Sequence, residues 1–256
     1  MRWEQLPSSI HPQVPAAGFA LSASFGPGGL DAGGHAAVAW LVIRGTVHIR
    51  ACEGEFLLSA GDWIVLGSES KPQALAGSRS VLLAAGLAHE SRARLLPGRG
   101  RMAHGERRQA LRSWRGGGPG VMGFLEGLQH ELVAGTDRCP GHSQRRRRQV
   151  LMRMQRARLC MEGQAEDGLP IAEMARRVNF SPWYFSKVFH ALYGMRPRQY
   201  AAAMRLERAS RLLATTALPV IEVSAACGFE NPCSFARAFR ARFGMTASEH
   251  RLRRGR

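Results

Sequence analysis

Residues Leu169–Met195 read LPIAEMARRVNFSPWYFSKVFHALYGM, and residues Leu218–Met245 read LPVIEVSAACGFENPCSFARAFRARFGM. The two segments align with an offset of 49 residues as far as Phe180 and Phe229, and with an offset of 50 beyond the inserted residue Glu230. A repeat of this length indicates one supersecondary unit that the chain uses twice.

Each copy has the pattern of two short helices around a tight turn. The first helix of the first copy is followed by Asn179, at the place that Gly228 holds in the second copy. Asn and Gly tolerate the left-handed backbone conformation that ends a helix and turns the chain. Ser181 and Asn231 then provide N-caps, each before a proline at the first helical position. Two helices and a turn of this size predict a helix-turn-helix unit.

The second helix of each copy has one apolar and one polar face. In the first copy, helical spacing predicts a buried face of Phe185, Val188, Phe189 and Leu192. Another face has the same spacing, and a helix in this position presents it to bases and phosphates in the DNA major groove. The predicted DNA-binding residues are therefore Trp183, Ser186, Lys187 and His190, and their repeat mates Cys233, Ala236, Arg237 and Arg240. The alternative is an ordinary helical hairpin with a solvated face, but Trp183 is an unusual residue to leave in water without a partner.

The segment between the copies is also a predicted helix, from Pro197 to about Ala214, with apolar residues at helical spacing. Such a helix holds two units at a fixed separation, so that they can read successive major-groove faces about 34 Å apart. The second face offers fewer hydrogen-bonding groups because Cys233 and Ala236 contribute little. We expect the first unit to supply most base discrimination and the second to add phosphate affinity, with Arg237 and Arg240 leading.

At this point the chain resembles the AraC/XylS family of bacterial transcription regulators over about 90 residues. The residues that carry the resemblance are Ser181, Phe185, Phe189, Gly194, Pro197, Tyr200, Arg205, Leu206, Glu207, Ala209, Leu212, Leu213, Gly228, Phe229, Phe235, Arg237, Phe239 and Gly244. The sequence departs from the family at Ser224, Ala247 and His250, where Ala, Pro and Tyr are usual, and these positions concern packing more than the reading face. The resemblance implies a transcription regulator that binds double-stranded DNA, and that contacts RNA polymerase if it is an activator.

The charge of the chain is unevenly distributed. The formal net charge is +17; residues 140–256 hold 22 Lys and Arg against 8 Asp and Glu, whereas residues 1–139 hold 14 against 11. Arg accounts for 34 of the 36 cations, which a GC-rich genome favours, but base composition does not explain the asymmetry. The C-terminal half is therefore expected to bind a polyanion.

Five cysteines form no metal-type pair, and their odd number favours a reduced intracellular protein. The sequence shows no signal-peptide pattern and no long apolar run. We expect a soluble cytoplasmic protein, associated with the nucleoid when bound to DNA, without a membrane partner and without a cofactor.

The predicted fold class is α+β, with an N-terminal β-barrel or jelly roll followed by an all-α domain. Short strand patterns and turn residues run from Ala37 to Leu87. The hairpin and the phrase LSAGDWIVL at residues 58–66 resemble the cupin-type sensor domain that many family members carry. The expected domains are 1–95 (sensor), 96–139 (connecting helices and linker) and 140–256 (DNA binding), with helix-turn-helix units at 169–195 and 218–245.

A barrel interior with apolar walls can hold one small molecule, and Trp40, His48 and Trp63 are the candidate pocket residues. Ordinary core or surface positions are an equally good interpretation of these three. Metal-binding cupins use closely spaced histidines, whereas His35 and His48 are 13 residues apart. We therefore expect no metal and no catalytic residues. A cupin enzyme fused to a DNA-binding tail, or a regulator controlled by a protein partner, are the alternatives.

Two further segments have candidate roles. An amphipathic helix, predicted to end near Gly135, carries an apolar stripe that either forms a homodimer, as such helices commonly do in the family, or packs on its own barrel. Its residues are Val121, Phe124, Leu125, Leu128, Leu132 and Val133. The predicted phosphate contacts are Arg145, Arg146, Arg147 and Arg148 at the start of the next helix, together with Arg205.

Overall fold

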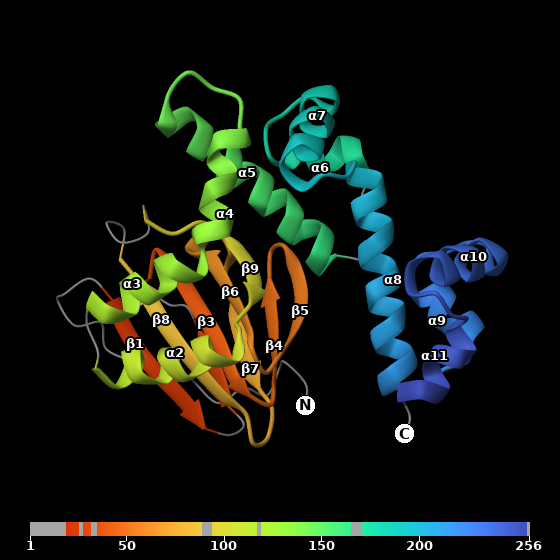
Figure 1. Cartoon of the computed structure of the whole chain (residues 1–256), viewed down its shortest axis with the longest axis horizontal. Coiled ribbons are helices and arrows are strands. Elements are labelled where there is room, and N and C mark those ends of the chain that lie inside the picture. Colours follow the sequence, from red (N-terminus) through yellow and green to blue (C-terminus); the bar gives the residue numbers. More distant parts are fainter. Residues whose placement is uncertain are drawn as a thin grey trace. The chain divides into compact units, whose positions relative to one another are not determined.

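The computed structural model describes residues 19–25, 28–31, 35–88, 94–116, 119–164 and 170–254 (Figure 1). The chain divides into two compact units, Met1–Leu159 and Cys160–Arg256. All the described strands lie in the first unit, and the described elements of the second unit are helices, which confirms the predicted α+β class. None of the described helices is long and apolar enough to span a membrane.

The described strands form two antiparallel sheets, and within the described residues these sheets do not close into one barrel. The five-stranded sheet has the order β1-β8-β3-β6-β9 and the four-stranded sheet the order β2-β7-β4-β5. The strands are β1 Phe19–Phe25, β2 Gly28–Asp31, β3 Ala37–Arg44, β4 Thr46–Ala51, β5 Gly54–Ser59, β6 Asp62–Gly67, β7 Gln73–Ala76, β8 Val81–Leu87 and β9 Gly98–Arg101.

The chain crosses from one sheet to the other at Gly45, between β3 and β4. Gly45 has φ +75°, and a Cβ there would lie 2.5 Å from Ser80 Oγ. That hydroxyl donates to the carbonyl of Thr46 at 2.7 Å and accepts from its N–H at 3.1 Å. A left-handed residue without a side chain therefore lets the two sheets diverge at this point.

Both faces of the five-stranded sheet are covered (Figure 1). One face shares a core with β4, β5 and β7 that includes Trp40, Phe56 and Leu159. The other face packs against the helices α2 His104–Gly116 and α3 Pro119–Leu128, which lie across it. Because both sides are covered, the first six residues of β3 are all buried, with no alternation of polar and apolar positions.

The apolar stripe predicted for dimerisation is used within the chain. Val121, Phe124 and Leu125 are buried against the five-stranded sheet, and Leu128 and Leu132 pack against the same cluster. The dimer interpretation of these five residues is therefore corrected: the face is already covered by the protein's own sheet. The helix also breaks at Gln129 before α4 His130–Ala134 and the 3-10 turn Gly135–Arg138.

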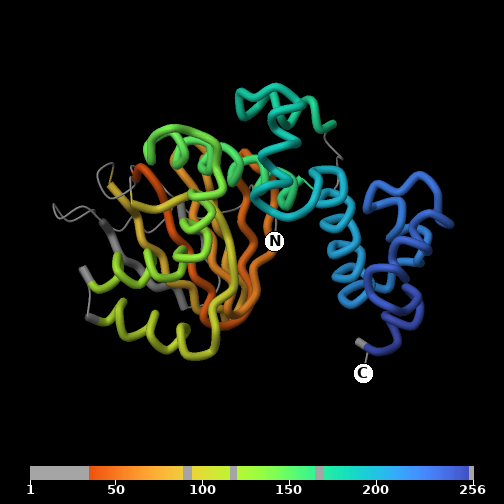
Figure 2. The backbone as a smooth tube through the Cα atoms, turned by 45° about the horizontal axis from the view of Figure 1, so that its top comes forward, coloured from red at the N-terminus to blue at the C-terminus, as the bar shows by residue number. Residues whose placement is uncertain are grey.

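Seven helices follow in the described part of the chain, and Figure 2 traces their path. They are α5 Gln144–Gly163, α6 Ile171–Arg177, α7 Pro182–Tyr193, α8 Pro197–Thr215, α9 Val220–Ala226, α10 Pro232–Phe243 and α11 Ala247–Arg254. Helix α5 runs across the division between the units. Helix α8 contacts α7 on one side and α9, α10 and α11 on the other, so it joins the two helix pairs as the repeat predicts.

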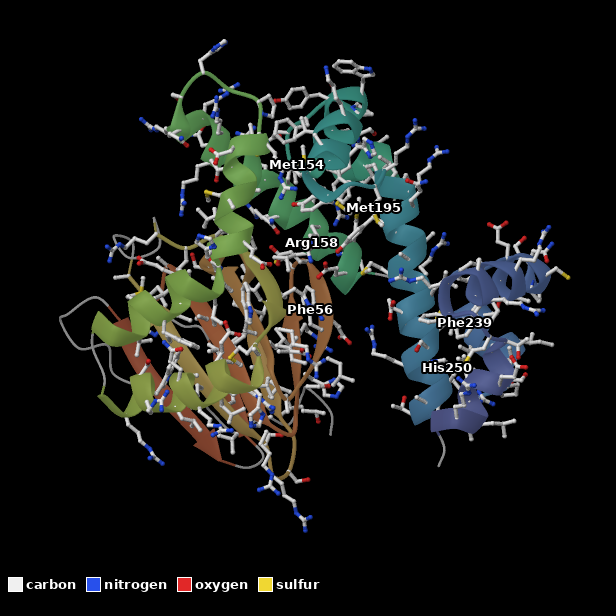
Figure 3. All side chains as sticks on the ribbon, viewed as in Figure 1. Phe56, Met154, Arg158, Met195, Phe239 and His250 are labelled. Carbon is white, nitrogen blue, oxygen red and sulfur yellow. The ribbon has the colours of Figure 1, made fainter. Side chains whose placement is uncertain are left out.

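Each helix pair is fastened by a similar side-chain contact from the helix that follows it. Tyr200 of α8 donates a hydrogen bond to Glu162 of α5, and its ring lies 5.4 Å from that of Phe189. His250 of α11 hydrogen-bonds Ser210 of α8 at 3.1 Å, and its ring lies 5.5 Å from that of Phe239 (Figure 3). The same scaffold is thus built twice with different polar partners.

Gln129 provides a test of the packing in the first unit. Its side chain is 1% exposed, accepts from the N–H of Leu96 at 2.8 Å and donates to the carbonyl of Leu96 at 2.7 Å. Gln129→Leu leaves both backbone groups buried without partners, so we expect a loss of about 2 kcal/mol in the free energy of unfolding. Urea denaturation followed by tryptophan fluorescence measures it, since four of the five tryptophans precede residue 160. The exposed Gln149→Leu is the control, and equal losses in both variants would contradict the role of Gln129.

Candidate nucleic-acid interface

The turns of the two helix pairs have the predicted conformation. Asn179 has φ +55° and Gly228 has φ +71°, so both residues are left-handed. Ser181 Oγ accepts the N–H of Tyr184 at 3.3 Å, and Asn231 Oδ1 accepts that of Cys233 at 2.8 Å. Helices α7 and α10 therefore start from equivalent caps, and both end at a left-handed glycine.

One face of each helix is fixed in the core. The buried residues of α7 are the four predicted, Phe185, Val188, Phe189 and Leu192, and α10 buries Phe235 and Phe239. The phenylalanine rings are 5.5 Å apart in α7 and 5.4 Å apart in α10. The opposite face of each helix is thereby held in one orientation.

The exposed face of α7 carries the four residues predicted to bind DNA. Trp183 is 70% exposed, and the Lys187 ammonium lies 5.0 Å from the centre of its ring. Ser186 is half-buried beside them, and His190 is exposed one turn later. The structure therefore brings together an apolar surface, a cation and two hydrogen-bonding groups.

This face borders a hollow of about 850 Å³ whose other wall is the start of α8. Arg196, Arg198 and Gln199 line that wall, and the sequence reasoning did not include them. The sequence does contain a pattern that indicates them, because two arginines and a glutamine surround Pro197, the first residue of a helix. The N–H groups at a helix N-terminus favour anions, and the adjacent cations reinforce that preference.

The exposed face of α10 has a different chemistry. Cys233, Ala236, Arg237 and Arg240 are all exposed, as predicted from the repeat. Arg242 does not belong to this face, because it pairs with Glu207 of α8 at 3.0 Å. The second face thus presents two guanidinium groups with one thiol and one methyl group.

The arginines predicted to contact phosphate lie in varied surroundings. Arg145 and Arg146 are exposed. Arg147 donates to the carbonyl of Gly141 at 2.9 Å. Arg148 donates to that of Leu95 at 3.5 Å, and burial lowers its pKa. The phosphate role of these four stays a prediction.

Arg205 has a structural role in the helical unit. Its Nη1 donates to the carbonyl of Gly228 at 2.8 Å, and its guanidinium lies 4.9 Å from the ring centre of Phe229. The side chain thereby fastens α8 to the turn of the second helix pair. Its predicted phosphate contact is untested.

The three candidate pocket residues of the β unit do not converge. Trp40 is buried between the sheets, whereas Trp63 is buried on the opposite face of the five-stranded sheet. His48 is exposed on β4, where its neighbours Val47 and Ile49 point inward. The prediction that the three line one pocket is therefore wrong, because β3 and β6 bury both of their faces while β4 buries only one.

The histidines and cysteines of the described residues show no metal site. No group of three or more His, Cys, Asp or Glu side chains with metal-binding geometry occurs there. His35 packs its ring against Gly86, and burial lowers its pKa. None of the five cysteines, all of which lie in the described part of the chain, forms a disulfide bond; Cys139 and Cys227 are buried, and burial raises the pKa of Cys139 to about 11.

Asn231→Ala tests the cap that starts α10. Because the cap satisfies two N–H groups of the first turn, we expect its loss to cost about 1 kcal/mol of local stability. Hydrogen exchange of peptides from α10, read by mass spectrometry, should then be about fivefold faster. Ser234→Ala in the same turn is the control, since its hydroxyl is not part of the cap. Equal exchange in both variants would contradict the role of Asn231.

Comparison with known proteins agrees with this geometry. A family described as a helix-turn-helix domain matches residues 174–253. The HTH-type transcriptional regulator CdhR of Pseudomonas aeruginosa is 36% identical over 91 residues, 36% of this chain but only 27% of that protein. The chain thus spans about a third or less of the length of the first curated relatives.

Two further proteins are matched over most of their own length. A transcriptional regulator structure from Chromobacterium violaceum, described by its AraC-type DNA-binding domain, is 29% identical with a TM-score of 0.40, covering 41% of this chain and 93% of that one. The HTH-type transcriptional activator AarP of Providencia stuartii is 30% identical over 92 residues, 36% of this chain and 68% of that protein. The chain belongs to the AraC/XylS family of transcription regulators.

Proposed function

We propose that the chain is a sequence-specific, DNA-binding transcription regulator that reads DNA with α7 and α10. The observation that carries the proposal is the duplicated geometry: two helices with equivalent caps and equivalent buried phenylalanines each leave a face exposed. A solvated hairpin does not need an exposed tryptophan beside a lysine, whereas in a DNA-reading helix the lysine can pair with guanine and the apolar ring can contact a thymine methyl group.

The linker helix supports simultaneous reading by the two faces. Helix α8 has 19 residues, and its rise of 1.5 Å per residue gives a length of about 28 Å. This length is close to the 34 Å that separates successive major-groove faces on one side of a duplex. Arg205 reinforces the spacing because it fastens α8 to the turn at Gly228.

The exposed faces of α7 and α10 are proposed to have different roles in DNA binding. Lys187 and His190 offer hydrogen bonds to base edges, with Ser186 beside them, and Trp183 offers apolar contact and one N–H donor. Arg196 and Arg198 would hold the DNA backbone next to this face, because phosphate contacts position a reading helix without specifying a sequence. Arg237 and Arg240 would lead the contacts of the second face.

The role of the β unit is a separate proposal. We infer that it is regulatory and that the chain is not an enzyme, an inference supported by the relatives, which are named as transcription regulators. Control by a small molecule in the β unit, homodimerisation and contact with RNA polymerase stay predictions. The alternative of a cupin-type enzyme predicts a bound metal, and elemental analysis of the purified protein tests for one.

Selection of DNA fragments by the full chain tests the proposed function. We expect one motif with two contact regions about one helical turn apart. Lys187→Ala should reduce the preference for that motif over a scrambled sequence about tenfold. Arg237→Ala should instead weaken binding to the motif and to the scrambled sequence alike, and should lower the number of ions released on binding by about one. Lys71→Ala, in the β unit, controls for the loss of one charge. Equal loss of specificity in the first two variants would contradict the proposal that the two faces have different roles. Binding without a motif would contradict sequence-specific reading.

Cysteine alkylation gives an independent test of the second face. Cys52 and Cys233 are exposed while Cys139 and Cys227 are buried, so iodoacetamide should modify the first two much faster. The selected DNA should slow modification of Cys233 at least about tenfold and leave Cys52, in the β unit, unchanged. Unchanged modification of Cys233 at saturating DNA would place the DNA away from α10.

A further inference from the structure

The helical unit contains a cavity that the proposed reading of DNA does not use. It has a volume of about 400 Å³ and lies between the end of α5, the start of α6 and the first turns of α8. Met161, Ile171, Met174 and Ala201 provide apolar walls. The volume falls in the range of small-molecule sites, about 300–1,000 Å³.

The repeat shows a sequence feature that opens this space. Ala201 follows Tyr200 on α8, and its repeat mate Arg251 follows His250 on α11. Arg251 extends its guanidinium to the carbonyl of Leu218, at the start of the second helix pair. In the first pair the corresponding position carries only a methyl group, and that methyl group lines the cavity.

The polar groups of the cavity select an anion. Arg198 and Arg205 line it, and no acidic side chain occurs among its described lining residues. Arg205 Nε is a buried donor that has no hydrogen-bond acceptor in the described part of the chain. A buried donor without an acceptor destabilises the protein, and a ligand carboxylate would supply an acceptor of opposite charge.

We propose that this cavity binds a small apolar monocarboxylate, with its tail against Met161 and Met174 and its carboxylate at Arg205 and Arg198. Methionine side chains adapt to tails of different shape, which suits a cavity with two of them on its walls. A neutral or cationic molecule with the same tail would leave the Arg205 donor without an acceptor and is therefore excluded from tight binding.

The site is placed to change DNA binding. Arg198 lines both the cavity and the hollow beside the reading face of α7. A carboxylate at Arg198 neutralises a cation that would otherwise face a phosphate. The ligand is expected to lower the affinity for DNA, and DNA to lower the affinity for the ligand by the same factor. This linkage rests on the proposed function, but ligand binding itself does not.

Calorimetric titration of the full chain with octanoate, in the absence of DNA, tests the site directly. Octanol and octylamine have the same tail and are the matched controls. We expect octanoate to bind at least about tenfold more tightly than either, since a charge-assisted hydrogen bond distinguishes it. Equal binding of octanoate and octanol, or no octanoate binding at millimolar concentration, would overturn the proposal.

Two alanines on α8 locate the binding. Ala201→Leu fills the cavity and should weaken octanoate binding at least about tenfold, whereas Ala202→Leu, which does not line it, should change binding less than about twofold. Arg198→Gln should weaken octanoate but not octanol. Equal effects of the two alanine variants would place the ligand elsewhere.

DNA affinity is measured on the same samples with and without octanoate. Normal DNA binding without octanoate binding removes the ligand proposal and leaves the proposed function standing. Octanoate binding by a chain that does not select DNA removes the proposed function and leaves the cavity assignment standing. Octanoate binding that leaves DNA affinity unchanged overturns the linkage.

Discussion

Burial of two phenylalanines one turn apart is the constraint on which the orientation of both α7 and α10 depends. Phe185 and Phe189 in α7, and Phe235 and Phe239 in α10, are at most 1% exposed. Since side chains four residues apart lie on one face of a helix, burying them fixes the rotation of the helix about its axis. The residues on the far side differ between the two copies, with Trp183 and Lys187 in α7 and Cys233 and Arg237 in α10. The amphipathic pattern therefore anchors the helix and at the same time presents its exposed face.

The aromatic ring supplied by the following helix completes each anchor, and here the two copies differ in chemistry. Tyr200 donates to a carboxylate, Glu162, while His250 bonds the neutral hydroxyl of Ser210. His250 nevertheless keeps the ring packing, at 5.5 Å from Phe239 and 5.6 Å from Phe243. Relative to Tyr200 in the first copy, His250 has a different polar partner and a similar ring contact.

Local patterns made the helical unit predictable, whereas the β unit depends on distant partners. Asn179, Ser181 and the phenylalanine spacing each specify structure within one or two turns of chain. Strand β9, Gly98–Arg101, has no apolar side chain and exists because it pairs with β6. The four residues of β7 likewise depend on distant partners, since β2 and β4 pair with that strand on either side. An amphipathic stripe reveals that a face is buried but not what covers it, and the helix at Val121 illustrates this limit.

The two copies of the repeat carry different chemistry on similar scaffolds. The anchors are buried phenylalanines, whereas Lys187 and its mate Arg237 are exposed. The first copy combines an exposed tryptophan and lysine with a cavity behind α6, and the second combines two arginines with Arg251 bound to a backbone carbonyl. Arg205 contacts both copies, since it lines the cavity of the first and donates a hydrogen bond to the turn of the second. A ligand bound in the cavity, as proposed, would therefore meet a side chain that also holds the turn of the second copy.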